Sequence, residues 1–296
     1  MYRAHFGLRE PPFGLTPDTS FTFSCRAHQA ALNTLLVALA SGEGFIKITG
    51  EVGTGKTLLC RRFLTTVEAR CVTAYIPNPQ LEARALMLAL AEELHLPVEP
   101  GLEQHQLLKQ LNHALLDFAR EGRRVVVCLD EAQAIPLDTL EALRLLSNLE
   151  TEKRKLLQVV LFGQPELDRN LAHESVRQLR QRITFEYRLA ALNRSELTLY
   201  LAHRLRVAGY TGGPLFSRGA VRAIYRATRG VPRLVNVLAN KALLLVFGEG
   251  GHTVLGRHIR AAARDTPATR APRSRWWWWS AALPALGGGG VWWWLR

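Results

Sequence analysis

The sequence predicts an α/β domain with a parallel β-sheet covered by helices on both faces, followed by a smaller all-helical domain. Three observations support this prediction. Short apolar segments of strand length alternate with helical patterns, a phosphate-binding loop follows the first of these segments, and the strand patterns stop after residue 192. Buried parallel strands are apolar along their whole length, because helices cover both faces of the sheet.

The elements follow one another in a regular order. A helix is expected over 28–40, and the first strand is FIKIT at 45–49. The later strands are expected at 71–75, 125–129, 158–162 and 183–189, with helices from 55, over 82–95, over 103–120 and over 138–150. Such alternation is typical of strand–helix–strand crossovers. Four more helical segments, at 193–209, 216–230, 231–248 and 257–264, make up the second domain.

The two ends of the chain differ from its middle. Residues 1–24 are rich in Pro, Phe and Thr and are expected to form an extended arm with turns. We therefore divide the chain into this arm, an α/β core at 25–191, a helical lid domain at 192–265, a basic linker at 266–275 and an apolar tail at 276–296.

The tail holds all seven tryptophans and twenty consecutive uncharged residues. A helix of that length spans about 30 Å, the thickness of a bilayer core, and two Trp clusters match two aromatic belts. Pro284 and four consecutive glycines weaken such a helix. We expect a membrane-spanning segment; an interfacial or irregular tail is the alternative.

Composition excludes several classes of protein. With 48% apolar residues the 296-residue chain can bury a core, which excludes a disordered chain. The four cysteines form no CxxC pair, which disfavours a zinc site, and the first residues lack the apolar run of a signal peptide. The net charge of +13 resides in the second half: residues 1–150 carry 14 basic and 17 acidic groups, residues 151–296 carry 24 and 8.

The strongest motif is a P-loop. Gly50, Glu51, Val52, Gly53, Thr54, Gly55, Lys56 and Thr57 fit GxxxxGK[ST], and Leu58 follows in the opening helix. The backbone amides and the helix N-terminus favour bound phosphate, Lys56 reaches the β- and γ-phosphates, and Thr57 is placed to ligate Mg²⁺. The order of the glycines disfavours a dinucleotide oxidoreductase. The sequence therefore predicts a site for ATP and Mg²⁺.

A second motif places two acids at the end of a strand. Asp130 and Glu131 directly follow the apolar segment VVVCL. Two adjacent carboxylates are costly unless a cation compensates them, so we expect Asp130 to hold Mg²⁺ and Glu131 to act as general base on the attacking water. A helix-capping role for one acid is the alternative.

Polar residues at three further places in the chain suit an ATPase. Gln164 follows the strand QVVLFG and is a candidate sensor of the γ-phosphate. Arg177, Arg180 and Arg182 precede the last strand, and one of them is a candidate finger for the γ-phosphate of a neighbouring subunit. Arg233 opens a helix of the second domain, where a lid closes on nucleotide. The alternatives are a loop glutamine for Gln164, a solvated face for the three arginines before the last strand, and a surface salt bridge for Arg233.

Together these motifs resemble an AAA+ ATPase over residues 25–265. The segments GEVGTGKTLLCR, AYIPNP, DEAQ, EALRLLSNLET, LFGQPELD and RQLRQRI are similar to the ExeA/GspA family of the general secretion pathway, most of all to its MshM-type members of MSHA pilus biogenesis. The resemblance implies a sheet ordered 5-1-4-3-2 and oligomerisation. It also implies that Lys56 and Thr57 form Walker A, Asp130 and Glu131 Walker B, Gln164 sensor 1, Arg180 or Arg182 the finger and Arg233 sensor 2, and that the arm at 13–18 flanks the adenine.

The resemblance implies an ATPase that assembles type IV pilus or type II secretion machinery from the cytoplasmic face of the inner membrane. Its expected partners are copies of itself and assembly proteins at that membrane. The alternative is a DNA-bound ATPase of the transposition-helper or origin-binding kind, which the basic second half favours. A nucleotide switch without appreciable turnover is a third interpretation.

Overall fold

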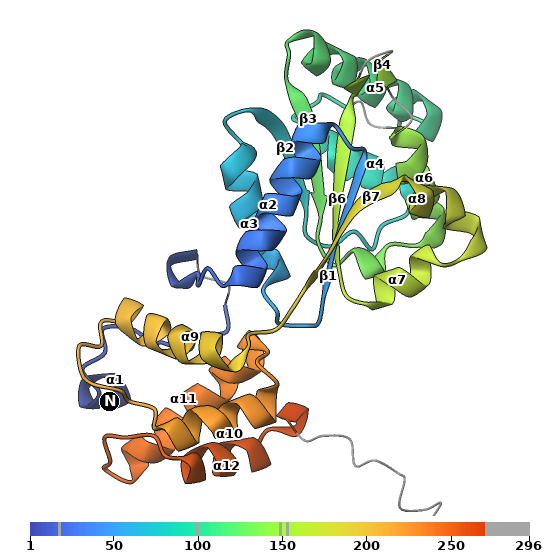
Figure 1. Cartoon of the computed structure of the whole chain (residues 1–296). Helices are drawn as coiled ribbons and strands as arrows, with labels where there is room; N and C mark the ends of the chain where they lie inside the picture. The colour runs from blue at the N-terminus through green and yellow to red at the C-terminus, as the bar shows by residue number, and fades with distance from the viewer. Residues whose placement is uncertain (17–18, 99–100, 148–149, 152–153, 270–296) are drawn as a thin grey trace, which may run out of the picture.

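Five parallel strands form the central sheet of the core (Figure 1). They are β1 (Phe45–Gly50), β2 (Cys71–Ile76), β3 (Arg124–Leu129), β6 (Leu157–Gly163) and β7 (Ile183–Leu189). Across the sheet they run β2-β3-β6-β1-β7, which confirms the expected order. The computed structural model describes residues 1–16, 19–98, 101–147, 150–151 and 154–269. The predicted tail lies outside these residues, and no helix within them is long and apolar enough to cross a bilayer.

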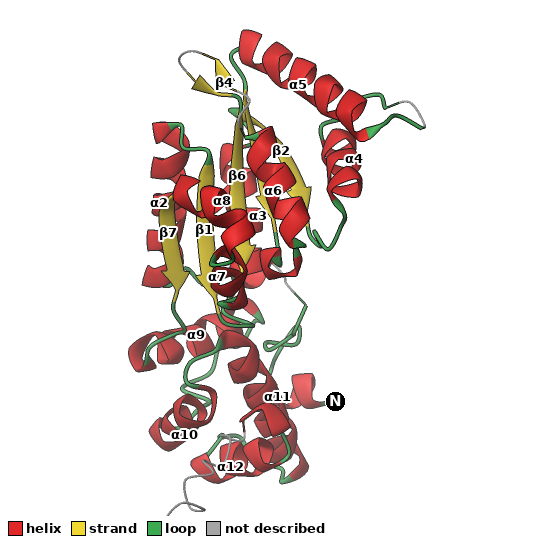
Figure 2. Ribbon diagram, turned by 90° about the vertical axis from the view of Figure 1, so that its right-hand side faces the viewer, coloured by secondary structure: helices red, strands yellow, loops and turns green. Residues whose placement is uncertain are grey.

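Helices cover both faces of the sheet, as Figure 2 shows from the side. One face packs against α2 (Arg26–Ser41) and α3 (Lys56–Val67), and the other against α4 (Ala83–Glu93), α5 (Gln104–Arg120), α6 (Leu137–Leu146), α7 (Glu166–Leu171) and α8 (Arg177–Arg182). In β1, Ile46 and Ile48 face the first layer and Phe45 faces the second, and all three are buried. The alternation follows from the two-residue repeat of a strand, and burial on both faces explains the unbroken apolar segments.

The lid domain consists of α9 (Arg194–Val207), α10 (Arg218–Thr228), α11 (Pro232–Gly248) and α12 (Gly256–Arg264) below the sheet (Figure 1). Asn193 caps α9, since its side chain accepts a hydrogen bond from the Glu196 amide. Pro232 is the first residue of α11, where the missing N–H of proline breaks no hydrogen bond of the helix. The lid has its own apolar core, which includes Leu197, Ile224 and Leu238.

The arm belongs to the lid core, which the sequence did not predict. It contains two short helical turns, α1 (Tyr2–His5) and a 3₁₀ turn at Thr19–Phe21, and it buries Phe6, Phe13 and Phe21 among the lid helices. Full burial of an aromatic side chain contributes about 1.5–3 kcal/mol, so these three residues attach the arm firmly.

One expectation about local structure was wrong, and two short helices were not predicted. The helix expected over 138–150 ends at Leu146, and the chain continues into a small antiparallel hairpin of β4 (Glu150–Thr151) and β5 (Arg154–Lys155). Between β6 and β7 lie the two helices that were not predicted, α7 and α8, which have six residues each. Helices this short show less than two turns of apolar periodicity, which is too little to recognise.

Candidate nucleotide-binding and catalytic site

The P-loop joins the C-terminal end of β1 to the first turn of α3. Gly53 and Gly55 have φ angles of 81° and 98°, a region that glycine occupies without strain. A Cβ on Gly55 would lie 2.7 Å from His28 Nε2, so the imidazole packs directly on the loop. Burial lowers the pKa of His28, and the ring is therefore neutral at neutral pH.

Lys56 is buried at the start of α3, where the P-loop ends. Its Nζ donates hydrogen bonds to the carbonyl oxygens of Gly50 at 2.8 Å and Glu51 at 3.2 Å. Burial lowers the pKa of Lys56, against the attraction of Glu131 and Asp130. The amine thus lies beside the ring of backbone amides, where phosphate oxygens would compete for its protons. Of the other predicted loop residues, Glu51 and Val52 are exposed, Thr54 is buried and Leu58 is half-buried.

Thr57 and Asp130 meet at the edge of the sheet. Thr57 Oγ1 donates to Asp130 Oδ2 at 2.6 Å, and the hydroxyl of Tyr75 lies 3.5 Å from the same oxygen. Burial and the neighbouring Asp130 charge raise the pKa of Tyr75 to about 12, so it is a neutral donor. A hydroxyl and a carboxylate oxygen are ligands that Mg²⁺ prefers. In the described ranges no group of three or more His, Cys, Asp or Glu could hold a metal ion.

Glu131 stands next to this pair in an unusual backbone conformation. Its φ is 53°, a left-handed conformation that costs a residue with a side chain roughly 1–2 kcal/mol. Its Oε2 accepts hydrogen bonds from Gln164 Nε2 at 2.9 Å and from Gln133 Nε2 at 2.5 Å. Burial raises the pKa of Glu131, but these two donors and the charge of Lys56 outweigh it, and the net pKa is lowered. The group is therefore a carboxylate at neutral pH, as a base requires.

Gln133 is a site residue that the sequence reasoning missed, although it closes the quoted motif DEAQ. Besides donating to Glu131, it accepts a hydrogen bond from the Gln164 amide through Oε1 at 2.9 Å. Asn170 of α7 donates to the Gln133 carbonyl at 2.9 Å. One glutamine thus connects the predicted base to the predicted sensor and to the helix behind them.

The three candidate finger arginines differ in their surroundings. All lie on α8; Arg177 and Arg180 are exposed, whereas Arg182 is half-buried and donates to Ser147 Oγ at 3.0 Å. A finger must be free to reach a neighbouring subunit. The geometry therefore favours Arg180 over Arg182 within the pair that the resemblance implied.

Arg233 brings the lid to the P-loop. It is the second residue of α11, and its amide donates to the Gly53 carbonyl at 3.3 Å while its side chain remains exposed. A Cβ on Gly53 would lie 2.5 Å from the Cβ of Arg233, so the contact requires glycine at this position. The first turn of α11 thus rests on the loop expected to hold phosphates.

A largely apolar cavity extends from the P-loop into the junction of arm, core and lid. Its lining includes Phe21, Phe23, His28, Leu58, Tyr200 and Pro232. Phe13, from the segment expected to flank the adenine, is buried in the lid core, and the arm residues that line this cavity are 21–23. Asp18 lies outside the described residues.

Comparison with known proteins agrees with this geometry. Residues 39–171 match the AAA domain family. Over 270 residues the chain is 40% identical to general secretion pathway protein A of Aeromonas hydrophila; the match covers 91% of this chain and 49% of that protein, so the chain spans about half the length of this curated relative. Its fold is similar to Cdc6p of Pyrobaculum aerophilum, with a TM-score of 0.65, 19% identity and coverage of 84% of this chain and 71% of the other. It is also similar to RuvB of Thermotoga maritima, with a TM-score of 0.56, 15% identity and coverage of 84% and 73%.

The sheet order, the P-loop and the helical lid define a P-loop protein with the AAA fold. The chain is a homologue of general secretion pathway protein A, which confirms the resemblance to the ExeA/GspA family. The AAA domain matched at 39–171 contains the P-loop, the Asp130–Glu131 pair and Gln164.

Proposed function

We propose that the chain binds ATP with Mg²⁺ and hydrolyses it to ADP and phosphate. The observation that carries the proposal is the meeting of Thr57 Oγ1 and Asp130 Oδ2 at 2.6 Å beside a buried Lys56 and the Glu131 carboxylate. A metal ligand pair, a phosphate-binding cation and a base in one place are the parts that phosphoryl transfer needs.

Each residue has a defined task in this proposal. The amides of the loop and Lys56 would bind the β- and γ-phosphates, and Thr57 and Asp130 would hold Mg²⁺, which neutralises charge on the phosphate oxygens when bound. Glu131 would accept a proton from water as the water oxygen bonds to the γ-phosphorus and the bond to the β-phosphate oxygen breaks. Gln164 would orient that water, and Arg233 would contact the phosphates from the lid.

The replacement Glu131→Gln tests this assignment. It keeps the shape of the side chain and removes the base, so we expect ATP binding to persist and steady-state phosphate release to fall by about 10²-fold or more. Glu92→Gln, at an exposed position of α4, is the matched control and is expected to leave both unchanged. Unchanged phosphate release in Glu131→Gln would refute the assignment, and no release from the unaltered chain would favour a nucleotide switch.

For its cellular role, we propose that the chain is an oligomeric assembly factor for type II secretion or MSHA-type pilus machinery at the cytoplasmic face of the inner membrane. The relationship to general secretion pathway protein A supports the pathway, and the Trp-rich apolar tail supports membrane attachment. The full chain is expected to fractionate with the inner membrane and to lose this association when residues 276–296 are deleted. Fractionation with the cytosol before the deletion would contradict the proposal.

The DNA-bound alternative is supported only by positive charge. The structural relatives reported above are less than 25% identical to this chain and support the fold alone. Because phosphate contacts release counterions, duplex binding that falls steeply with salt would favour this alternative.

A further inference from the structure

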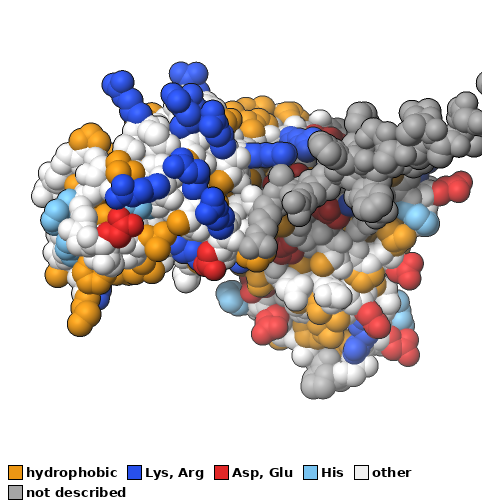
Figure 3. Space-filling model, turned by 90° about the horizontal axis from the view of Figure 1, so that it is seen from below, with side chains coloured by type: hydrophobic (Ala, Val, Ile, Leu, Met, Phe, Trp, Pro, Cys, Tyr) orange, Lys and Arg blue, Asp and Glu red, His pale blue; other side chains and the backbone are white. Residues whose placement is uncertain are grey.

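The lid carries a row of exposed arginines on the side that faces away from its core. Arg218, Arg222 and Arg226 lie on α10, Arg229 directly follows that helix, and Arg260 of the adjacent α12 completes what we call the arginine face. The buried side chains of α10, among them Val221 and Ile224, lie on the other side of that helix. Figure 3 shows this end of the molecule, where Lys and Arg side chains gather with few acidic ones between them.

Arg260 lies near the beginning of α10. A Cβ on Gly256 would lie 3.3 Å from the guanidinium of Arg260 and 3.3 Å from the carbonyl oxygen of Gly219. The two helices therefore present one continuous surface, with a spacing of four residues along most of the α10 row.

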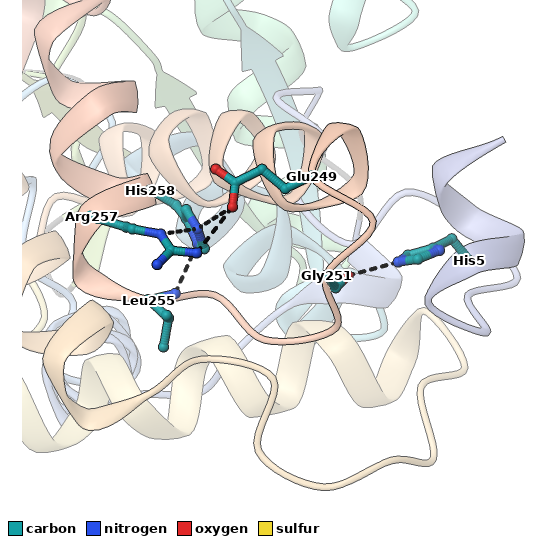
Figure 4. A network of polar contacts seen from close by, with 6 residues as sticks. All are labelled: His5, Glu249, Gly251, Leu255, Arg257 and His258. Atoms are coloured by element: carbon teal, nitrogen blue, oxygen red, sulfur yellow. Dashed lines mark hydrogen bonds and ion pairs between the residues drawn. The ribbon is translucent and has the colours of Figure 1, made fainter.

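Nothing in the described part of the lid neutralises the arginine face, since none of its five residues forms an ion pair there. Residues 192–269 contain twelve Lys and Arg but only three acids, and all three are engaged elsewhere. Glu196 caps α9, and Asp265 pairs with Lys241 at 2.6 Å. Glu249 pairs with Arg257 and contacts the buried His258 at 3.1 Å each (Figure 4). Four like charges in one row repel one another, so an anionic partner would stabilise the surface.

The position of the face in the chain indicates which anion it meets. The described structure ends at Thr269, and the first tryptophan of the tail is Trp276. Seven residue steps span at most about 25 Å even when fully extended. A tail in the bilayer would therefore hold Thr269, at the end of the lid domain, within about 25 Å of the headgroups. The linker between them adds Arg270, Arg273 and Arg275 and no acid.

We propose that the arginine face docks the lid on a membrane surface of anionic phospholipid headgroups, beside the point where the tail enters. Guanidinium groups bind phosphate oxygens through paired hydrogen bonds, and positive side chains near such a surface are attracted to it within a Debye length. The proposal deepens the membrane attachment proposed above and rests on it. Docking fixes the orientation of the lid, and through Arg233 and Gly53 it connects the membrane surface to the P-loop.

Binding of the full chain to lipid vesicles tests the proposal. Because all seven tryptophans lie in the tail, their fluorescence reports the tail separately from the lid. Vesicles of neutral phosphatidylcholine are compared with vesicles that contain phosphatidylglycerol, for the unaltered chain and for a double variant, Arg222→Glu with Arg226→Glu. Arg70→Glu with Arg123→Glu, exposed on the core, is the control with the same change in net charge.

We expect the unaltered chain and the control to prefer the anionic vesicles. The double variant is expected to retain the blue shift of tryptophan emission with both vesicles. It should lose at least about fivefold in this preference for each arginine, at least about 25-fold in all, because each replacement removes a cation and adds an anion. An unchanged preference in the double variant would overturn the arginine face while leaving the tail attachment intact. Absence of a blue shift with any vesicle would overturn the tail attachment, and with it this proposal. Tight duplex DNA binding that the double variant loses, without any anionic vesicle preference, would reassign the face to nucleic acid.

Discussion

Gln133 holds the carboxylate of Glu131: its Nε2 donates to Glu131 Oε2 at 2.5 Å, and the same oxygen accepts a bond from Gln164 at 2.9 Å. The predicted base is thus fixed by two neutral donors while its own backbone adopts a left-handed conformation with φ of 53°. A base positioned in this way can orient water without reorganising during the reaction.

Replacing Gln133 by Ala is therefore expected to impair turnover and not nucleotide binding. Loss of a hydrogen bond to a charged group is worth about 1.5–3 kcal/mol, which corresponds to roughly 10- to 100-fold in kcat. The Kd for ATP should change little, because Gln133 forms its hydrogen bonds with Glu131, Gln164 and Asn170, which lie outside the P-loop and the cavity lining. Gln104→Ala, exposed at the start of α5, is the control; equal kcat in the two variants would contradict a positioning role.

The pH dependence of turnover tests the same contacts. Burial raises the pKa of Glu131, and the donors Gln164 and Gln133, with Lys56, lower it below its ordinary value. In the unaltered enzyme the carboxylate therefore persists as pH falls to its ordinary pKa of 4.5 and below. Removing both donors leaves burial opposed only by the charge of Lys56, so the pKa of Glu131 rises and the acidic limb of kcat moves to higher pH. An acidic limb at the same pH in Gln133→Ala with Gln164→Ala would contradict this cause.

Most of the fold was predictable because its strands have a simple pattern. Segments such as VVVCL are buried on both faces of the sheet, and their unbroken apolar sequence is enough to predict a strand. The glycines with Lys56 and Thr57 identify the loop that follows the first strand. The contact between Gln133 and Gln164 joins residues 31 positions apart, and no local pattern reports it.

The packing of the arm is a second feature that the sequence pattern could not predict. Its Pro-rich composition correctly disfavours long helices, but composition says nothing about where Phe13 and Phe21 are buried. Tertiary packing with the lid helices decides where these two rings lie.

Mixing two inactive variants tests the finger. Arg180→Ala retains its own P-loop, and Lys56→Ala retains its own Arg180, so a mixed oligomer contains sites that combine an intact loop with an intact arginine. We expect each variant alone to lose about 10³-fold or more in kcat, the scale of an arginine finger, and the mixture to recover measurable activity. Recovery with Arg182→Ala in place of Arg180→Ala would assign the finger to Arg182, and no recovery with either would argue against a finger supplied by a neighbour.

Arg204 joins the arm to the lid and is expected to matter for stability. This buried residue donates to the Pro12 carbonyl at 2.6 Å, and its guanidinium lies 4.5 Å from the centre of the Phe21 ring. Arg204→Ala removes a charged hydrogen bond and a cation–π contact, and we expect the free energy of unfolding to fall by about 2–4 kcal/mol. ATP should also bind more weakly, because Phe21 lines the cavity beside the P-loop. Arg206→Ala, exposed on the same helix, is expected to change the unfolding free energy by less than about 0.5 kcal/mol. A similar effect of both replacements in chemical denaturation would contradict this role.

The central claim is that the loop from Gly50 to Thr57 binds the triphosphate of ATP while Asp130 and Glu131 complete the Mg²⁺-dependent centre. A crystal structure with Mg²⁺ and a non-hydrolysable ATP analogue tests it most directly. We expect the Lys56 amine to have left the carbonyl oxygens of Gly50 and Glu51 for the phosphates, with the ion between Thr57 and Asp130 and the Glu131 carboxylate facing the γ-phosphate. An analogue bound elsewhere, or a bound triphosphate from which both carboxylates point away, would contradict the claim.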